Sequence, residues 1–75
     1  MALHRVILTF DPEIIIVPII DNLTQQFNLT TNIYQRNAAE GHSWLELDII
    51  GEDKDIEDGI AWVVSKGIRV RPFNE

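Results

Sequence analysis

The chain has 75 residues, enough for one small domain, and its 12 acidic and 6 basic side chains give a formal net charge of −6. The acidic balance argues against nucleic-acid and anionic-membrane partners, which both need a basic surface. The absence of cysteine excludes disulfides, zinc fingers and thiol catalysis. With 45% apolar and 24% charged residues, the composition is that of a globular chain rather than a disordered one.

We expect residues 1–75 to form a single domain that is cytoplasmic and not inserted in a membrane. The longest apolar run, residues 14–20, is interrupted by Pro18 and is far shorter than the ~18 residues that a membrane-spanning helix needs. A core of this size supplies only ~3–5 kcal/mol of net stability, so pairing with a second copy would bury useful additional surface.

The first half of the chain predicts a strand, a helix and a second strand. Residues 5–10 are rich in β-branched and aromatic side chains and end at an Asp-Pro turn signal. An apolar stripe with helical spacing indicates a helix that begins near Pro18 and stops at Asn28. Residues 29–36, with their Thr, Ile and Tyr content, predict the second strand.

The third strand follows a polar connection of hairpin length, residues 37–41. Residues 44–49 show the clearest alternation of apolar and polar side chains in the chain, and Gly51 closes this strand. Leu45, Leu47 and Ile49 therefore share one face of the predicted sheet.

A second helix and a last strand complete the predicted order. Residues 52–58 hold five carboxylates and one lysine, which suits the positive end of a helix, and Asp53 is the expected cap. Gly67 is well suited to the position after the helix end. Residues 68–71 alternate again and predict the fourth strand.

The resulting order, strand-helix-strand-strand-helix-strand, is the split βαβ pattern of a ferredoxin-like fold. We therefore predict an α+β, βαββαβ sandwich in which two helices cover one face of a four-stranded antiparallel sheet and leave the other face bare. By strand parity, the side chains on the bare face are those of Arg5, Ile7, Thr9, Asn32, Tyr34, Arg36, Trp44, Glu46, Asp48, Arg69 and Arg71.

The bare face has two alternative interpretations. Aromatic and apolar side chains set among charges resemble an interaction surface, with Ile7, Tyr34 and Trp44 as candidate contact residues. The second interpretation is ordinary cross-strand pairing, in which Arg5 or Arg36 meets Glu46 or Asp48 and each pair contributes ~0.2–1 kcal/mol.

The ordered set of motifs resembles the NIL domain, the ferredoxin-like module at the C-terminus of methionine-importing ABC ATPases and of some ferredoxins. Asn32-Ile33-Tyr34 matches the Asn-Ile-Leu that names the family, with tyrosine in place of leucine. The segments 5–10, 45–51, 55–63 and 67–70 follow the family pattern as well.

The resemblance implies a non-catalytic regulatory module that pairs with a second copy and binds an amino acid such as methionine at or near the homodimer interface. It implies that Asn32, together with Ile33 and Tyr34, lies at the ligand site, where an amide could orient an amino-acid backbone. An Asn that bonds only its own backbone is the alternative. A second functional alternative is a protein-interaction subunit, without a small ligand, of a separately encoded transporter or enzyme.

The sequence offers no catalytic, cofactor or metal site. There is no Gly-x-x-x-x-Gly-Lys run, and the two histidines, His4 and His42, have no evident orienting partner. The apolar loop residues Ile14 and Ile15 are candidates for a dimer contact, with a pocket wall or the edge of the core as alternatives. Gly59 inside the second helix indicates close packing against the first helix or a partner.

Overall fold

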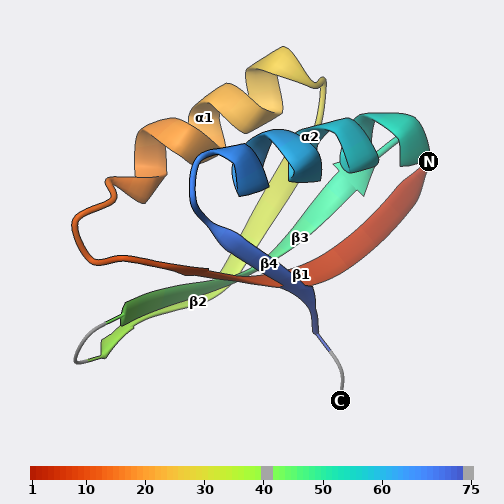
Figure 1. Cartoon of the computed structure of the whole chain (residues 1–75). Coiled ribbons are helices and arrows are strands. Elements are labelled where there is room, and N and C mark those ends of the chain that lie inside the picture. The colour runs from red at the N-terminus through yellow and green to blue at the C-terminus, as the bar shows by residue number, and fades with distance from the viewer. Residues whose placement is uncertain (40–41, 74–75) are drawn as a thin grey trace.

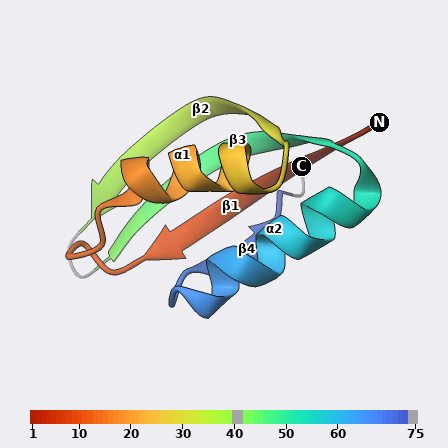
Figure 2. The same ribbon diagram turned by 90° about the horizontal axis from the view of Figure 1, so that it is seen from above.

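The computed structural model describes the backbone of residues 1–39 and 42–73, and the side chains of residues 1–36 and 43–73. Four strands form one sheet in the order β2-β3-β1-β4, and every neighbouring pair is antiparallel. Both helices lie on the same face of this sheet, as Figure 1 and Figure 2 show, which confirms the predicted ferredoxin-like fold. The elements are β1 (Ala2–Phe10), α1 (Ile16–Gln26), β2 (Thr30–Ala39), β3 (His42–Gly51), α2 (Asp53–Ser65) and β4 (Arg69–Pro72).

The core lies between the sheet and the two helices. Alternate residues of β1 and β3 point into it, because side chains along a strand alternate between the two faces of the sheet. Leu8 pairs with Leu45 and Val6 with Leu47, and all four are buried. Leu23 of α1 faces them and has no exposed surface. The other buried apolar residues are Phe10, Ile16, Ile20, Leu29, Ile49, Ile56, Val63 and Ile68.

The helix starts differ from the predicted ones by one or two residues. Helix α1 begins two residues before Pro18, which is tolerated there because the N–H groups of a first turn have no partner within the helix. The position before α2 is taken by Glu52 rather than by Asp53, and no side chain caps it. Asp53 and Asp55 instead lie in the first turn, where their charges favour the positive end of the helix.

The two helices contact each other at Gly59, as the sequence predicted. A Cβ atom at this position would lie 2.8 Å from Leu23 Cδ1 and 2.9 Å from Leu29 Cδ1. Next to this contact, the rings of Phe27 and Trp62 pack with their centroids 5.9 Å apart. Trp62 is therefore half-buried on the flank of α2. Neither helix in the described part of the chain is long and apolar enough to cross a membrane.

Gly67 follows α2 with a φ of 86°, in the left-handed region that disfavours side chains with a Cβ. We expect Gly67→Ala to lower the free energy of unfolding by about 1 kcal/mol, because no atom crowds the new methyl group and only the backbone conformation opposes it. Urea unfolding measures this value. Asn28, with a φ of 55°, provides the matched control: Asn28→Gly should not destabilise the chain, and equal stability of Gly67→Ala and the wild type would contradict the prediction.

Strand β2 contains an irregularity that the sequence analysis did not predict. Its register with β3 runs from Asn32–Asp48 and Ile33–Leu47 directly to Gln35–Glu46, so Tyr34 is an extra residue and forms a β-bulge. Beyond a bulge of one residue, the two faces of a strand exchange. The prediction that Arg36 lies on the bare face is therefore wrong, because Arg36 pairs with Leu45 and lies on the helix side.

Candidate functional site

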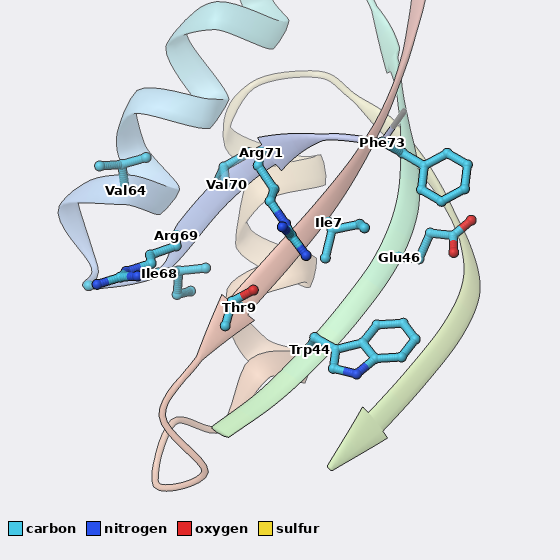
Figure 3. A pocket seen from close by; sticks show the side chains of 11 residues that line it. Ile7, Thr9, Trp44, Glu46, Val64, Ile68, Arg69, Val70, Arg71 and Phe73 are labelled. Atoms are coloured by element: carbon cyan, nitrogen blue, oxygen red, sulfur yellow. The ribbon is translucent and has the colours of Figure 1, made fainter. Parts of the chain in front are cut away.

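The face of the sheet opposite the helices, here called the open face, carries a broad hollow of about 990 Å³ (Figure 3). On this face, strands β1, β3 and β4 supply its floor, and the chain after β4 supplies Phe73 at one side. Around the edge of the sheet at β4, the hollow continues to Val64 of α2 and to the connection between α2 and β4. We call this depression the open-face hollow. Its lining consists of Ile7, Thr9, Trp44, Glu46, Val64, Gly67, Ile68, Arg69, Val70, Arg71 and Phe73.

Strand register arranges the centre of the open-face hollow in two parallel rows. One row runs across the three strands from Glu46 through Ile7 to Arg71, and Figure 3 shows Ile7 between the two charged side chains. The next row runs from Trp44 through Thr9 to Arg69. Because neighbouring strands lie about 4.8 Å apart, the backbones at the two ends of a row are about 10 Å apart.

A charged cluster lies next to these rows on the same face. Arg5 Nε donates a hydrogen bond to Asp48 Oδ1 at 3.0 Å, and the Tyr34 hydroxyl donates to Asp48 Oδ2 at 2.5 Å. The Arg5 guanidinium carbon also lies 4.1 Å from the centroid of the Tyr34 ring. Asp48 is only 1% exposed, so its two carboxylate oxygens are held by protein donors rather than by water.

These contacts set the charge state of the cluster. The hydrogen bond from Arg5 and then the one from Tyr34 hold the pKa of Asp48 below its ordinary value, and they outweigh the loss of solvent around the carboxylate. The hydrogen bond to Asp48 raises the pKa of Arg5 in turn. Of the cross-strand pairs that the sequence allowed, Arg5 with Asp48 is therefore the one that forms.

Glu46 is a second buried carboxylate, but it differs from Asp48 in having no partner. It is 8% exposed, and no hydrogen bond or ion pair to it is found among the described residues. Every fully enclosed side-chain oxygen of the described residues has a hydrogen-bond partner. Because the carboxylate oxygens of Glu46 have no partner, they are not fully enclosed, and they are reached from the open-face hollow that Glu46 lines. A buried carboxylate open to a hollow is available for a ligand donor.

A model of the NIL domain family matches residues 4–72. The chain belongs to the NIL domain family. No curated protein sequence matches this NIL domain.

Two solved structures resemble the NIL domain in fold. The C-terminal domain of an ABC transporter ATP-binding protein from Enterococcus faecalis has 22% sequence identity and a TM-score of 0.79, covering 96% of this chain and 84% of that chain. The de novo designed protein Foldit4 has 9% identity and a TM-score of 0.58, covering 97% of this chain and 96% of that chain. Likeness at identities this low shows that the folds are shared.

The three residues expected at the ligand site of the NIL domain do not all point the same way. Asn32 lies opposite Asp48 on the open face. The half-exposed Tyr34 lies there too, and its hydroxyl donates a hydrogen bond to Asp48. Ile33 points to the helix side, where it lines a small cavity with Val17 and is 52% exposed. Strand β2 is an edge strand of the sheet, which explains the exposure of Ile33.

The residues expected at an interface fall into two neighbouring groups. Ile7, Tyr34 and Trp44 lie on the open face, as strand parity predicted. Ile14 and Ile15 lie in the loop between β1 and α1, and together with Trp44 they line a second hollow of about 290 Å³. Ile14 is half-buried against the core, whereas Ile15 is 75% exposed.

The histidines of the NIL domain are far apart along the sheet. His4 pairs with Ile49 near one end of β3, whereas His42 is at the other end, where it pairs with Ala39. Nε2 of His4 lies 3.8 Å from Asp53 Oδ1 at the start of α2. Within the described residues, no three His, Asp or Glu side chains are grouped as ligands of a metal ion.

Sequence reasoning did not single out Phe73 or Glu46 as members of a site. Phe73 continues the pairing of β4 after Pro72, because its N–H donates to the Arg5 carbonyl at 3.0 Å. Its ring lies 5.9 Å from the Arg5 guanidinium. An aromatic residue just beyond the predicted strand 68–71 and Pro72 was the available signal for Phe73. The burial of Glu46 depends on neighbours that only the fold brings together.

Proposed function

We propose that this NIL domain is a non-catalytic regulatory module that forms a homodimer through its open face. It binds an amino acid such as methionine at or near the dimer interface, in the region of Asn32, Ile33 and Tyr34, and it acts in the cytoplasm on a transporter ATPase or another separately encoded partner. Membership of the family supports the regulatory class. The E. faecalis neighbour, a C-terminal domain of an ABC transporter ATP-binding protein, supports a place beside a transporter ATPase.

The observation that carries the proposal is the uncovered open face with its hollow. Both helices lie on the other side, so Ile7, Trp44 and Phe73 are only partly buried by the described residues of the chain itself. Partly buried aromatic side chains in a depression are typical anchors of protein interfaces and ligand sites. A second copy over this face would add the buried surface that a 75-residue core lacks.

One observation favours the alternative of a protein-interaction subunit without a small ligand. The Tyr34 hydroxyl already donates to Asp48, and Arg5 lies over the ring of Tyr34. A side chain fixed in this way is well suited to a rigid protein interface. A ligand at Asn32 would therefore have to be recognised by the amide and by the adjoining hollow.

A titration tests the ligand part of the proposal. We expect one of the twenty amino acids or a sulfur metabolite, at millimolar concentration, to raise the thermal midpoint, because a ligand at one hundred times its Kd stabilises the folded state by about 2.7 kcal/mol. Asn32→Ala should remove the shift, whereas Asn22→Ala, on the exposed surface of α1, should keep it. The absence of any response across the set would contradict this part and favour the interaction subunit.

Sedimentation velocity tests the dimer separately. The wild type should sediment as a dimer at micromolar concentration. Trp44→Glu should shift it to the monomer, because a charge would be buried in the interface. Ala61→Glu, on the exposed side of α2, is the matched control and should leave the dimer intact. A monomeric wild type would contradict the dimer.

A further inference from the structure

We propose that the open-face hollow binds the charged groups of a free α-amino acid with an apolar side chain, the ammonium group at Glu46 and the carboxylate at Arg71. The inference rests on the proposed function, because it assigns a place and a recognition chemistry to the amino-acid ligand. The place is adjacent to the Tyr34 bulge, since Gln35, the residue after the bulge, pairs with Glu46.

The first support is the pair of unneutralised opposite charges on one row of the sheet. Glu46 is buried without a partner, and no ion pair to Arg71 occurs among the described residues. Ile7 separates the two side chains, and Figure 3 shows that the Arg71 guanidinium does not extend to the Glu46 carboxylate. An acceptor and a donor group thus remain on opposite sides of an apolar floor.

The second support is that this arrangement of charges disfavours ligands that carry only one sign of charge. An anion without a cationic group would enter the field of the buried Glu46 carboxylate, and a cation without an anionic group would meet the guanidinium groups of Arg69 and Arg71. A zwitterion satisfies both ends at once. An ammonium group donates hydrogen bonds to a carboxylate, and the planar guanidinium of arginine donates two parallel hydrogen bonds to the carboxylate of the ligand.

The third support is the apolar surface beside the charges. Ile7 forms the floor between them, and Trp44 lies in the adjacent row of the same hollow. A ligand whose ammonium and carboxylate groups occupy the Glu46–Arg71 row would direct its side chain over this surface, where burial of apolar area favours binding. The hollow therefore selects an amino acid with an apolar side chain over a polar one.

The test uses ligands that each lack one charge. Calorimetric titrations of the wild type compare L-methionine with N-acetyl-L-methionine, which lacks the ammonium group, and with L-methionine amide, which lacks the carboxylate. The same series is measured for L-phenylalanine. We expect each blocked ligand to bind at least about 10-fold more weakly than the free amino acid, because the charged group left without its partner remains desolvated.

Two variants then assign each charge to its partner. Glu46→Gln should weaken the binding of L-methionine about 10-fold and leave N-acetyl-L-methionine unchanged, and Arg71→Gln should weaken L-methionine similarly and leave the amide unchanged. Glu57→Gln on α2 and Arg36→Gln on the helix side of β2 are the matched controls and should bind like the wild type. Thermal unfolding verifies that all four variants are folded. The comparison of free and blocked ligands on the wild type tests the inference even if a variant fails to fold.

The outcomes separate this inference from the proposed function. Binding of L-methionine that depends on Asn32 but not on Glu46 or Arg71 overturns the inference and leaves the proposed ligand in place. Equal affinity of the free and blocked ligands overturns it as well. If neither amino acid binds at millimolar concentration, the inference is wrong, and the other amino acids of the screen then decide the ligand part of the proposed function.

Discussion

Gly59→Val is expected to lower the free energy of unfolding by about 2–3 kcal/mol, a large part of the stability of a domain this small. Added carbon atoms at this position meet Leu23 Cδ1 and Leu29 Cδ1 at distances that no packed Cβ atom adopts. Leu23 has no exposed surface and Leu29 is buried, so neither side chain has free space to move into. Either these two leucine side chains would have to take other rotamers in the buried core or the two helices would have to separate, and both changes loosen the packing.

Urea unfolding followed by far-UV circular dichroism measures this change. The control is Ala61→Val, two residues further along α2 on its exposed side, where the same side chain costs only about 0.5 kcal/mol through its lower helix propensity. If both variants lose the same stability, helix propensity rather than the contact between the helices explains the loss. The contact would then not be the reason for a glycine in the middle of α2.

The fold was largely predictable because its determinants are local. Alternation along residues 44–49, the apolar stripe of the first helix and the acidic start of the second each depend on near neighbours in the sequence. The order of these elements then restricts the topology to a small number of choices. The contact at Gly59 was predictable for a similar reason, since a glycine inside a helix lowers its stability and indicates a packing requirement.

The bulge at Tyr34 was not predictable from the pattern of side chains. Thr, Asn, Ile and Tyr in sequence fit a regular strand as well as a bulged one, because the extra residue is defined by its pairing with β3. One unpaired residue was enough to move Arg36 to the helix side. The same bulge brings the Tyr34 hydroxyl to Asp48, so the irregularity contributes directly to the charged cluster.

The different environments of the two carboxylates of β3 also depended on tertiary structure. Glu46 and Asp48 occupy equivalent alternate positions of one strand, and both were predicted on the bare face. Asp48 pairs across the sheet with Arg5, whereas Glu46 pairs with Ile7. Register therefore gives one carboxylate a cationic partner and leaves the other open to the hollow.

The net charge of −6 is unevenly distributed over the surface of the domain. Three arginines and two carboxylates face the open side of the sheet: Arg5, Arg69, Arg71, Glu46 and Asp48. The excess of acidic residues therefore belongs to the helices and loops, above all to the start of α2. The acidity of the whole chain does not oppose the binding of a carboxylate on the open face, where Arg69 and Arg71 have no ion-pair partner among the described residues.

The Arg5–Asp48–Tyr34 cluster is expected to make the stability of the domain fall steeply in acid. The pKa of Asp48 is lowered by its hydrogen bonds with Arg5 and Tyr34, so the folded state binds the proton less readily than the unfolded chain. The contribution of the cluster is complete above the ordinary carboxyl value near 3.8 and is lost as the pH falls through the lower value of the folded state. Arg5, whose pKa is raised, stays charged throughout this range.

Chemical unfolding of the wild type and Asp48→Asn between pH 7 and pH 2 measures this loss. At neutral pH the variant should be less stable, because the Arg5 guanidinium loses its charged partner and the Tyr34 hydroxyl loses a carboxylate acceptor. Below about pH 3.8 the difference between the two proteins should shrink, since protonation makes the Asp48 side chain of the wild type neutral as well. Asp58→Asn, on the exposed surface of α2, should follow the wild type at every pH. A difference between the wild type and Asp48→Asn that stays constant over the whole range would show that the carboxylate contributes shape and not charge to the open face.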